Sequence, residues 1–271
     1  MLTKEHKEFI ATQKIVADKT TQAWIHFFEK IQVDAERKEK NRKFLRRMQL
    51  IWFLLLLLVV FGGSDLLRNS ENVGISAIGL LLIFILIRVE MARNKSISAE
   101  NPNFLNHIQF FVLPVISILE KDIKQNSTLH LELDLRAPFY TPELKKSTYK
   151  YNGWNVSFYQ IVFIKLKATF EDKIILNFMI MDRLKKLERT KISASGRTKI
   201  KRKFKGKTTY IAKVAFPNNA FSSEETLQEK KGRIVKVVKK LQINTQENYR
   251  YKKEIVFEAI ANAFSGIKKL N

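Results

Sequence analysis

Apolar residues gather in two blocks within the first third of the chain. The first block covers residues 48–67 and holds an uninterrupted apolar run at 50–61, and the second block covers residues 73–87. A helix needs about 20 residues to cross roughly 30 Å of hydrocarbon, so the flanks of each block must share the crossing. About a dozen apolar residues would also suit a buried helix, but two such blocks with arginines outside them favour a membrane. The pattern predicts a transmembrane helical hairpin with spans at about 48–67 and 72–91.

Basic residues lie outside the two blocks and are scarce between them. The connecting loop carries only Arg68, which Asp65 and Glu71 offset. The positive-inside rule then places both termini in the cytoplasm and predicts a two-pass protein of the plasma (bacterial inner) membrane. The basic residues that flank the blocks most closely are Arg46, Arg47, Arg88, Arg93 and Lys95.

Two further segments have helical patterns. Residues 1–47 contain no proline or glycine and carry a partial apolar stripe that includes Trp24, Phe27 and Phe28. This stripe favours one amphipathic helix. Residues 103–124 predict another helix, which Pro114 should kink or end early.

Alternation of apolar and polar residues marks strands in the middle of the chain. In residues 128–136 leucines alternate with polar side chains, which is typical of a half-buried strand. Other strands are predicted from their β-branched and aromatic content. In the tail, from Ser223 onward, the sequence favours two helical segments. We expect an antiparallel sheet of five or six strands, either a small sandwich or an open barrel. The expected strands cover residues 128–136, 156–170, 174–183 and 208–216, with a polar hairpin at 187–207.

Together these elements predict an α+β membrane protein. Its fold class is a two-helix transmembrane hairpin with a long N-terminal helix and a cytoplasmic antiparallel β-rich domain flanked by helices. The expected domains are a cytoplasmic amphipathic helix at 1–47, the hairpin at 48–92, the β-rich domain at 97–218 and a C-terminal helical segment at 219–271.

The charge of the chain points to an anionic partner. Its 49 Lys and Arg residues outnumber its 26 Asp and Glu residues, which gives a formal net charge of +23. Such a surplus attracts phospholipid head groups or nucleic acid. The chain has no cysteine, which excludes thiolate metal sites, disulfides and thiol nucleophiles.

The densest basic run covers residues 183–213, where thirteen basic residues accompany the single acid Glu188. Three interpretations remain open: a solvated hairpin whose lysines protect a sheet edge, a docking surface for lipid head groups, and a phosphate-binding face for a nucleotide or a nucleic acid. No zinc-finger spacing or RNP-like sequence supports the last one. The candidate anion-binding residues are Arg197, Lys199, Lys201, Arg202, Lys203, Lys205 and Lys207.

No catalytic motif is recognisable. The chain lacks a Walker loop, GxGxxG, HExxH and a GxSxG elbow, and its four histidines are scattered. His130, Glu132 and Asp134 share one face of a predicted strand, where a solvated polar face is favoured over a metal site. We therefore expect no enzyme activity, no cofactor and no metal. One aromatic group would line a ligand pocket or, as we favour, pack in a core or interface: Tyr149, Tyr151, Trp154, Phe158 and Tyr159.

The sequence favours a membrane-anchored binding or scaffold module that engages an anionic partner through its basic hairpin. Besides the lipid bilayer, the expected partners are lipid head groups, a nucleotide or a nucleic acid. One alternative is an oligomeric two-span effector or channel gated by its soluble domain, since two helices cannot enclose a pore without other copies of the chain. Another alternative is an enzyme that acts at the membrane surface.

Overall fold

A computed structural model of the chain describes residues 2–62, 84–85, 88–89, 102–123, 127–170, 173–192, 196–217, 221–223, 234–243, 253–265 and 267–269. The chain divides into two units. Unit 1 combines Met1–Glu29 with Asn103–Asn271 and contains the β-sheet. Unit 2 covers Lys30–Pro102.

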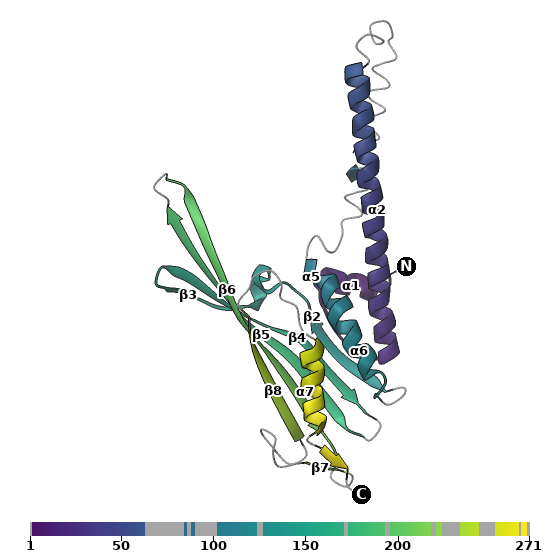
Figure 1. Cartoon of the computed structure of the whole chain (residues 1–271), viewed down its shortest axis with the longest axis vertical. Coiled ribbons are helices and arrows are strands. Elements are labelled where there is room, and N and C mark those ends of the chain that lie inside the picture. The colour runs from purple at the N-terminus through teal and green to yellow at the C-terminus, as the bar shows by residue number, and fades with distance from the viewer. Residues whose placement is uncertain are drawn as a thin grey trace. The chain divides into compact units, whose positions relative to one another are not determined.

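A seven-stranded antiparallel sheet forms the body of unit 1 (Figure 1). Its strand order is β1-β2-β4-β5-β6-β8. Strand β3 pairs with residues 154–159 of β4, and β2 pairs with residues 164–167 of the same strand. The order is open, with β1 and β8 at its edges, so neither a closed barrel nor a two-sheet sandwich is formed by these strands. The strands are β1 (Lys14–Thr20), β2 (Thr128–Asp134), β3 (Lys145–Tyr151), β4 (Trp154–Thr169), β5 (Ile175–Ile192), β6 (Thr198–Ala215) and β8 (Ile234–Ile243).

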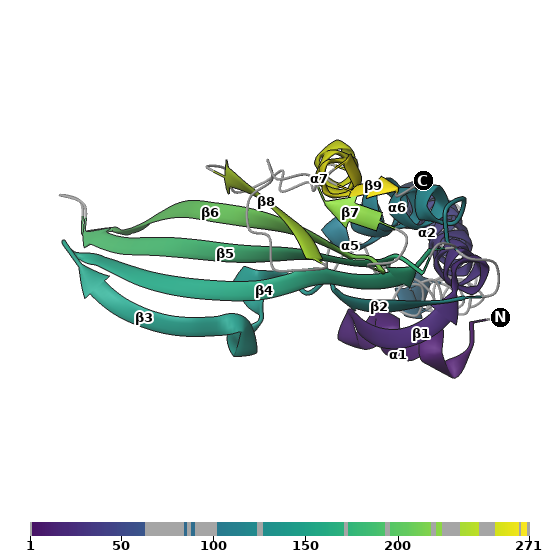
Figure 2. The same ribbon diagram turned by 90° about the horizontal axis from the view of Figure 1, so that it is seen from below.

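Helices cover one face of the sheet at one end (Figure 2). Helix α5 (Pro102–His107) continues through a π-helical turn (Ile108–Val112) into α6 (Leu113–Leu119), and α7 (Lys253–Ser265) lies over β6 and β8. Phe111 packs edge-on against Phe163 of β4 at 5.6 Å, and Phe264 of α7 packs against Phe170 at 5.2 Å. Pro114 lies in the first turn of α6 and follows the π-helical turn, so it interrupts the regular helix without ending it.

The predicted leucine alternation is confirmed in β2. Leu129, Leu131 and Leu133 are buried and pair with residues of β1, and Leu131 and Leu133 also pair with β4 on the other side. Trp24 closes this core from helix α2 (Thr21–Gly62), where its Nε1–H donates a 3.0 Å hydrogen bond to the carbonyl oxygen of Leu129. The predicted α+β class with a large antiparallel sheet is thus confirmed for unit 1.

The N-terminal segment is not one helix. Helix α1 (Lys4–Thr12) ends at Gln13, which has a positive φ of 55°, and β1 then runs before α2 (Thr21–Gly62) begins. Strand β1 contains β-branched residues, and all seven of its residues pair with β2. Because these partners lie far downstream, the helical pattern of the sequence could not disclose the strand.

The tail also differs from the prediction. Residues 234–243 form β8, an edge strand paired with residues 206–215 of β6, and not the first predicted helix. Their valines and isoleucines favour a strand over a helix, and β6 offers them an open edge. The second predicted helix corresponds to α7, which is followed by a short β9 (Ile267–Lys269) paired with β7 (Phe221–Ser223).

The transmembrane prediction is corrected. Residues 48–62 of the first apolar block belong to α2, a 42-residue helix whose residues before the block are strongly charged. Arg46 and Arg47 directly precede the block, and its apolar run at 50–61 is by itself shorter than the roughly 20 residues that a crossing needs. Within the part of the chain that the structure describes, no helix is both long and apolar enough to cross a membrane.

The transmembrane hairpin, the multi-pass membrane class and the two-pass plasma-membrane localisation are therefore wrong by this finding. Apart from residues 84–85 and 88–89, the second predicted span at 72–91 lies outside the described residues. The described part of unit 2 is mainly α2, in which Asp34 forms ion pairs with Arg37 at 2.8 Å and Lys38 at 2.9 Å. Burial raises the pKa of Asp34, but the two ion pairs outweigh it and lower the pKa overall.

The contact between Trp24 and Leu129 yields a stability prediction. The Trp24 side chain is 0% exposed. Replacing Trp24 with Phe removes the donor for the buried Leu129 carbonyl and opens a cavity, so we expect the free energy of unfolding to fall by about 1–3 kcal/mol. Urea denaturation would measure this change. Ile192→Ala is the control, because Ile192 is 77% exposed and its loss should change stability by about 0.5 kcal/mol or less. Equal midpoints for both variants would contradict the assignment.

Candidate functional site

The hairpin formed by β5 and β6 has two unlike faces, because successive strand residues point to opposite sides of a sheet. Even-numbered β5 residues such as Phe178 and Ile180 are buried in the core. Odd-numbered residues from Arg183 to Lys191 therefore point to the other side. The register carries this division into β6, where residue 199 pairs with 191 and residue 207 with 183. We call the sheet surface that faces away from the helices the open face.

Cations line the open face in paired rows. The hairpin contributes four of them from β5 and five from β6, about 7 Å apart along each strand and about 5 Å apart between strands. None of the described residues of β3, β4, β5 and β6 that share this face is acidic. We call this set the cation track: Arg183, Lys185, Arg189, Lys191, Lys199, Lys201, Lys203, Lys205 and Lys207.

The structure places the seven predicted anion-binding residues in three different positions. The five lysines at 199, 201, 203, 205 and 207 lie together on the open face, and all are exposed. Arg202 lies on the opposite face, where its Nε donates a 2.8 Å hydrogen bond to Glu188. Arg197 is exposed and precedes β6. Successive strand residues point to opposite faces, and this rule could have been applied to the basic run in the sequence. It would have excluded Arg202 from the candidate anion-binding residues and included the four cations of β5.

Glu188 neutralises charge on the opposite face. Besides Arg202, it forms an ion pair with Lys186 at 3.0 Å. The hydrogen bonds from Arg202 and Lys186 lower the pKa of Glu188, despite an opposing effect of burial. The only acid of the basic run therefore leaves the cation track uncompensated.

Aromatic side chains flank the cation track on the same face. They come from the hairpin of β3 and β4, and we call them the aromatic row: Tyr149, Tyr151, Trp154 and Phe158. Tyr149 stacks on Phe158 with ring centroids 5.6 Å apart. Lys185 Nζ lies 5.2 Å from the Phe158 centroid, and Lys203 Nζ lies 5.3 Å from that of Trp154. The aromatic row and the cation track thus form one continuous surface.

Tyr159 does not belong to the aromatic row. It lies on the opposite face and packs with Leu144, Ile161 and Leu184 in a small core that Phe139 covers. Its ring meets that of Phe139 edge-on at 5.3 Å. Packing is the correct interpretation for Tyr159, whereas Tyr149 and Tyr151 remain 43% and 62% exposed.

A tight turn at residues 152–153 brings the end of the aromatic row to the cation track. Asn152 and Gly153 both have positive φ, 46° and 72°, as in a type I′ hairpin turn. A Cβ atom at position 153 would lie 3.5 Å from Nε of Arg189. The positive φ therefore favours glycine here, and the guanidinium group of Arg189 lies within ordinary van der Waals distance of this turn.

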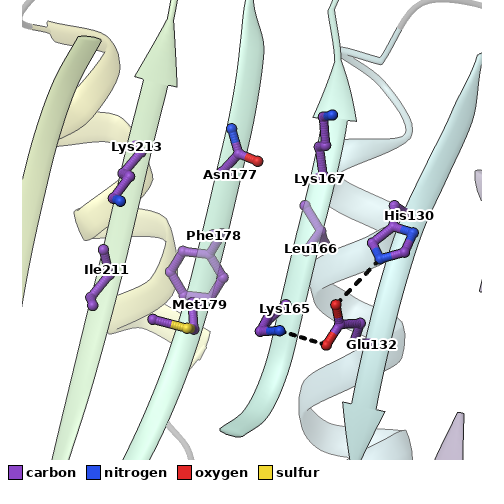
Figure 3. A pocket seen from close by; sticks show the side chains of 10 residues that line it. All are labelled: His130, Glu132, Lys165, Leu166, Lys167, Asn177, Phe178, Met179, Ile211 and Lys213. Carbon is purple, nitrogen blue, oxygen red and sulfur yellow. Dashed lines mark hydrogen bonds and ion pairs between the residues drawn. The ribbon is translucent and has the colours of Figure 1, made fainter. Parts of the chain in front are cut away.

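A cavity of about 240 Å³ lies further along the open face (Figure 3). Met179 and Ile211 provide apolar lining, and Lys167, Lys213 and Asn177 provide polar groups. At its side Lys165 Nζ donates a 2.7 Å hydrogen bond to Glu132, whose other oxygen lies 3.5 Å from Nε2 of His130. The hydrogen bond from Lys165 is the main cause of the lowered pKa of Glu132, while burial opposes it.

The polar residues considered for a metal do not converge. His130 and Glu132 are in contact, but Asp134 forms its ion pair with Arg136, at 2.7 Å. Among the residues covered by the structure, no group of three or more His, Asp or Glu side chains is arranged to hold a metal ion.

No protein-family model, no curated protein and no solved structure matches the chain. A functional assignment must therefore rest on the open face itself.

The ion pairs of Glu188 predict a pH-dependent contribution to stability. A lowered carboxyl pKa stabilises the folded state above the ordinary value of about 4.5, and this contribution is lost as the pH falls through the lowered pKa. We expect Glu188→Gln to reduce the free energy of unfolding at pH 7 by no more than about 1 kcal/mol, because the pairs are partly exposed. The difference in stability between the variant and the original chain should be smaller at pH 3 than at pH 7, because this contribution is lost as the pH falls through the lowered pKa.

Urea denaturation at both pH values would measure this. The control is the same substitution in a Lys186→Gln/Arg202→Gln background, where the effect of Glu188→Gln should no longer depend on pH. An equal loss at both pH values in the original background would contradict the assignment of the ion pairs.

Proposed function

We propose that the chain is a nucleic-acid-binding module and that the cation track on the open face contacts the phosphates. The observation that carries the proposal is the sorting of charge between the two faces. Glu188 compensates Lys186 and Arg202 on one face, whereas the described strand residues around the track include no acid. A surface without counter-charges attracts a polyanion and gains affinity by releasing its condensed counterions.

The shape of the track supports a polymeric partner. Five rows of side chains, from Arg183 and Lys207 to Lys191 and Lys199, extend over about 27 Å at strand spacing. A small anion would contact one or two rows, whereas a phosphate backbone would contact all of them. Lysine binds phosphate as a point charge without strict geometry, which suits recognition that does not depend on sequence.

Protection of a sheet edge does not explain the whole track. Among the residues that the structure describes, 198–205 of β6 pair with β5 alone, so their lysines would discourage pairing with another chain. Arg183 and Lys185 differ, because β5 is paired at these positions with β4 and with β6. Cations in the interior of a sheet face protect no edge, and an anionic partner gives them a role.

The proposal predicts that binding depends on the open face and not on net charge alone. We compare Lys201→Gln/Lys203→Gln, which removes two track cations, with Lys186→Gln/Arg202→Gln, which removes two cations from the opposite face. The probe is a labelled DNA duplex, and binding is followed by fluorescence anisotropy between about 50 and 200 mM salt. The first variant should weaken binding at least about tenfold near 0.1 M salt and reduce the slope of log K against log salt by about 2.

The second variant should leave the affinity within about twofold of the original chain and the salt slope unchanged, since it changes net charge equally but spares the track. Equal losses in both variants would contradict a defined interface. Vesicles that contain phosphatidylserine provide a further comparison. If the chain bound them in a track-dependent manner and bound no nucleic acid, the proposal would be wrong.

A further inference from the structure

We infer that the open face selects single-stranded over double-stranded nucleic acid, with bases stacking on the aromatic row while phosphates follow the cation track. This inference rests on the proposed function and names the class of nucleic acid. It is carried by the exposure of the aromatic rings, their position beside the cations, and the geometry of a nucleotide.

The two tyrosines of the aromatic row are exposed, whereas Trp154 and Phe158 are half-buried. Tyr151 is 62% exposed and Tyr149 is 43% exposed, although both lie on a β-strand within a sheet. Val156, the register partner of Tyr149 on the same face, is fully buried, so the aromatic side chains pack over it. Exposing large apolar rings to water is unfavourable, and such exposed surface marks interaction sites. On a surface that binds phosphates, stacking on bases is the function that suits these rings.

The row and the track are correctly placed for one strand of nucleic acid. The register pairs Phe158 with Lys185, and Trp154 and Arg189 directly follow the last pair of β4 and β5, Asn155 with Glu188. Aromatic side chains of β4 and cations of β5 therefore lie next to each other across the two strands. In a nucleotide the base and the phosphate are joined through the sugar. A strand lying along β5 could therefore direct phosphates to β6 and bases to β3 and β4.

The existing contacts indicate which rings would receive bases. Phe158 already stacks with Tyr149 and lies under Lys185. Trp154 has a cation near its ring, and Tyr151, its register partner on β3, is the most exposed ring of the row. Arg189 adds a flat guanidinium group at the turn of β3 and β4, and such groups also stack on bases. We therefore assign the stacking platform to Tyr151 and Trp154, with Arg189 beside them.

Duplex DNA cannot use this platform. Its bases are stacked on one another and expose only their edges, whereas a single strand can unstack and present whole base faces. Single-strand recognition of this kind tolerates many sequences, because every base has a flat aromatic face.

The test separates stacking from charge. Three labelled probes of equal length, about 16 residues per strand, are an oligo(dT), an abasic oligodeoxynucleotide with the same phosphates, and a duplex. The complete chain should bind oligo(dT) at least about tenfold more tightly than the abasic strand, as expected for two stacked bases. Tyr151→Leu/Trp154→Leu should abolish this preference while leaving affinity for the abasic strand within about twofold.

Two controls belong to this test. Phe110→Leu removes an equally exposed ring from the π-helical turn and should leave the preference unchanged, since Phe110 is 55% exposed and lies outside the open face. Tyr151→Leu alone should reduce the preference partially, which keeps the test valid if the double variant folds poorly.

Tryptophan fluorescence provides an independent measurement. The chain has three tryptophans, and Trp24 is buried. Oligo(dT), but not the abasic strand, should quench the emission, and Trp154→Phe should remove most of this quenching while retaining the preference for bases, because a ring remains.

The outcomes distinguish the two proposals. Equal affinity of the original chain for oligo(dT) and the abasic strand, or a tighter complex with the duplex, would overturn single-strand selection but leave phosphate binding intact. Absence of binding to all three probes would overturn the proposed function itself. Loss of the preference in Phe110→Leu would overturn the assignment to the aromatic row.

Discussion

The register of the three long strands β4, β5 and β6 determines everything else in unit 1. In an antiparallel sheet, a slip of one residue would exchange the two faces and expose the core while burying the cations. The core residues Leu176, Phe178 and Ile180 and the cations Arg183 and Lys185 occupy the same strand. Burial of the former therefore fixes the direction of the latter. The hydrophobic effect, which stabilises the fold, also orders the charged surface.

A β-bulge between Val162 and Ile164 adds a second element of control. Before the bulge, even-numbered residues such as Trp154 and Phe158 lie on the open face. After it, odd-numbered residues such as Lys165 and Lys167 do so. The extra residue changes the parity of β4, so that aromatic side chains at one end and lysines at the other share one surface. Bulges commonly redirect side chains in this way near functional sites.

Sequence patterns predicted the elements whose partners are local or whose alternation is strict. Strand β2 was predicted because its leucines alternate with polar residues. The lysines of β6 were predicted as candidate anion-binding residues because they form a dense basic run. Strand β1 and strand β8 were missed, since their conformations depend on distant pairing partners. The transmembrane spans were wrong because composition within a window does not reveal that α2 continues a charged helix. The surface shared by Trp154 and the cations depends on a register across a bulge, which no linear pattern displays.

The placement of β1 has a consequence for synthesis of the chain. The hydrogen bond between Trp24 and Leu129 joins residues that are 105 positions apart, with all of unit 2 between them. At about 5–20 residues per second, the ribosome needs roughly 5–20 s to produce β2 after β1 has been made. During that interval the apolar side chains of the N-terminal segment have no sheet against which to pack. The contact between Trp24 and Leu129 can therefore form only after all of unit 2 has been synthesised.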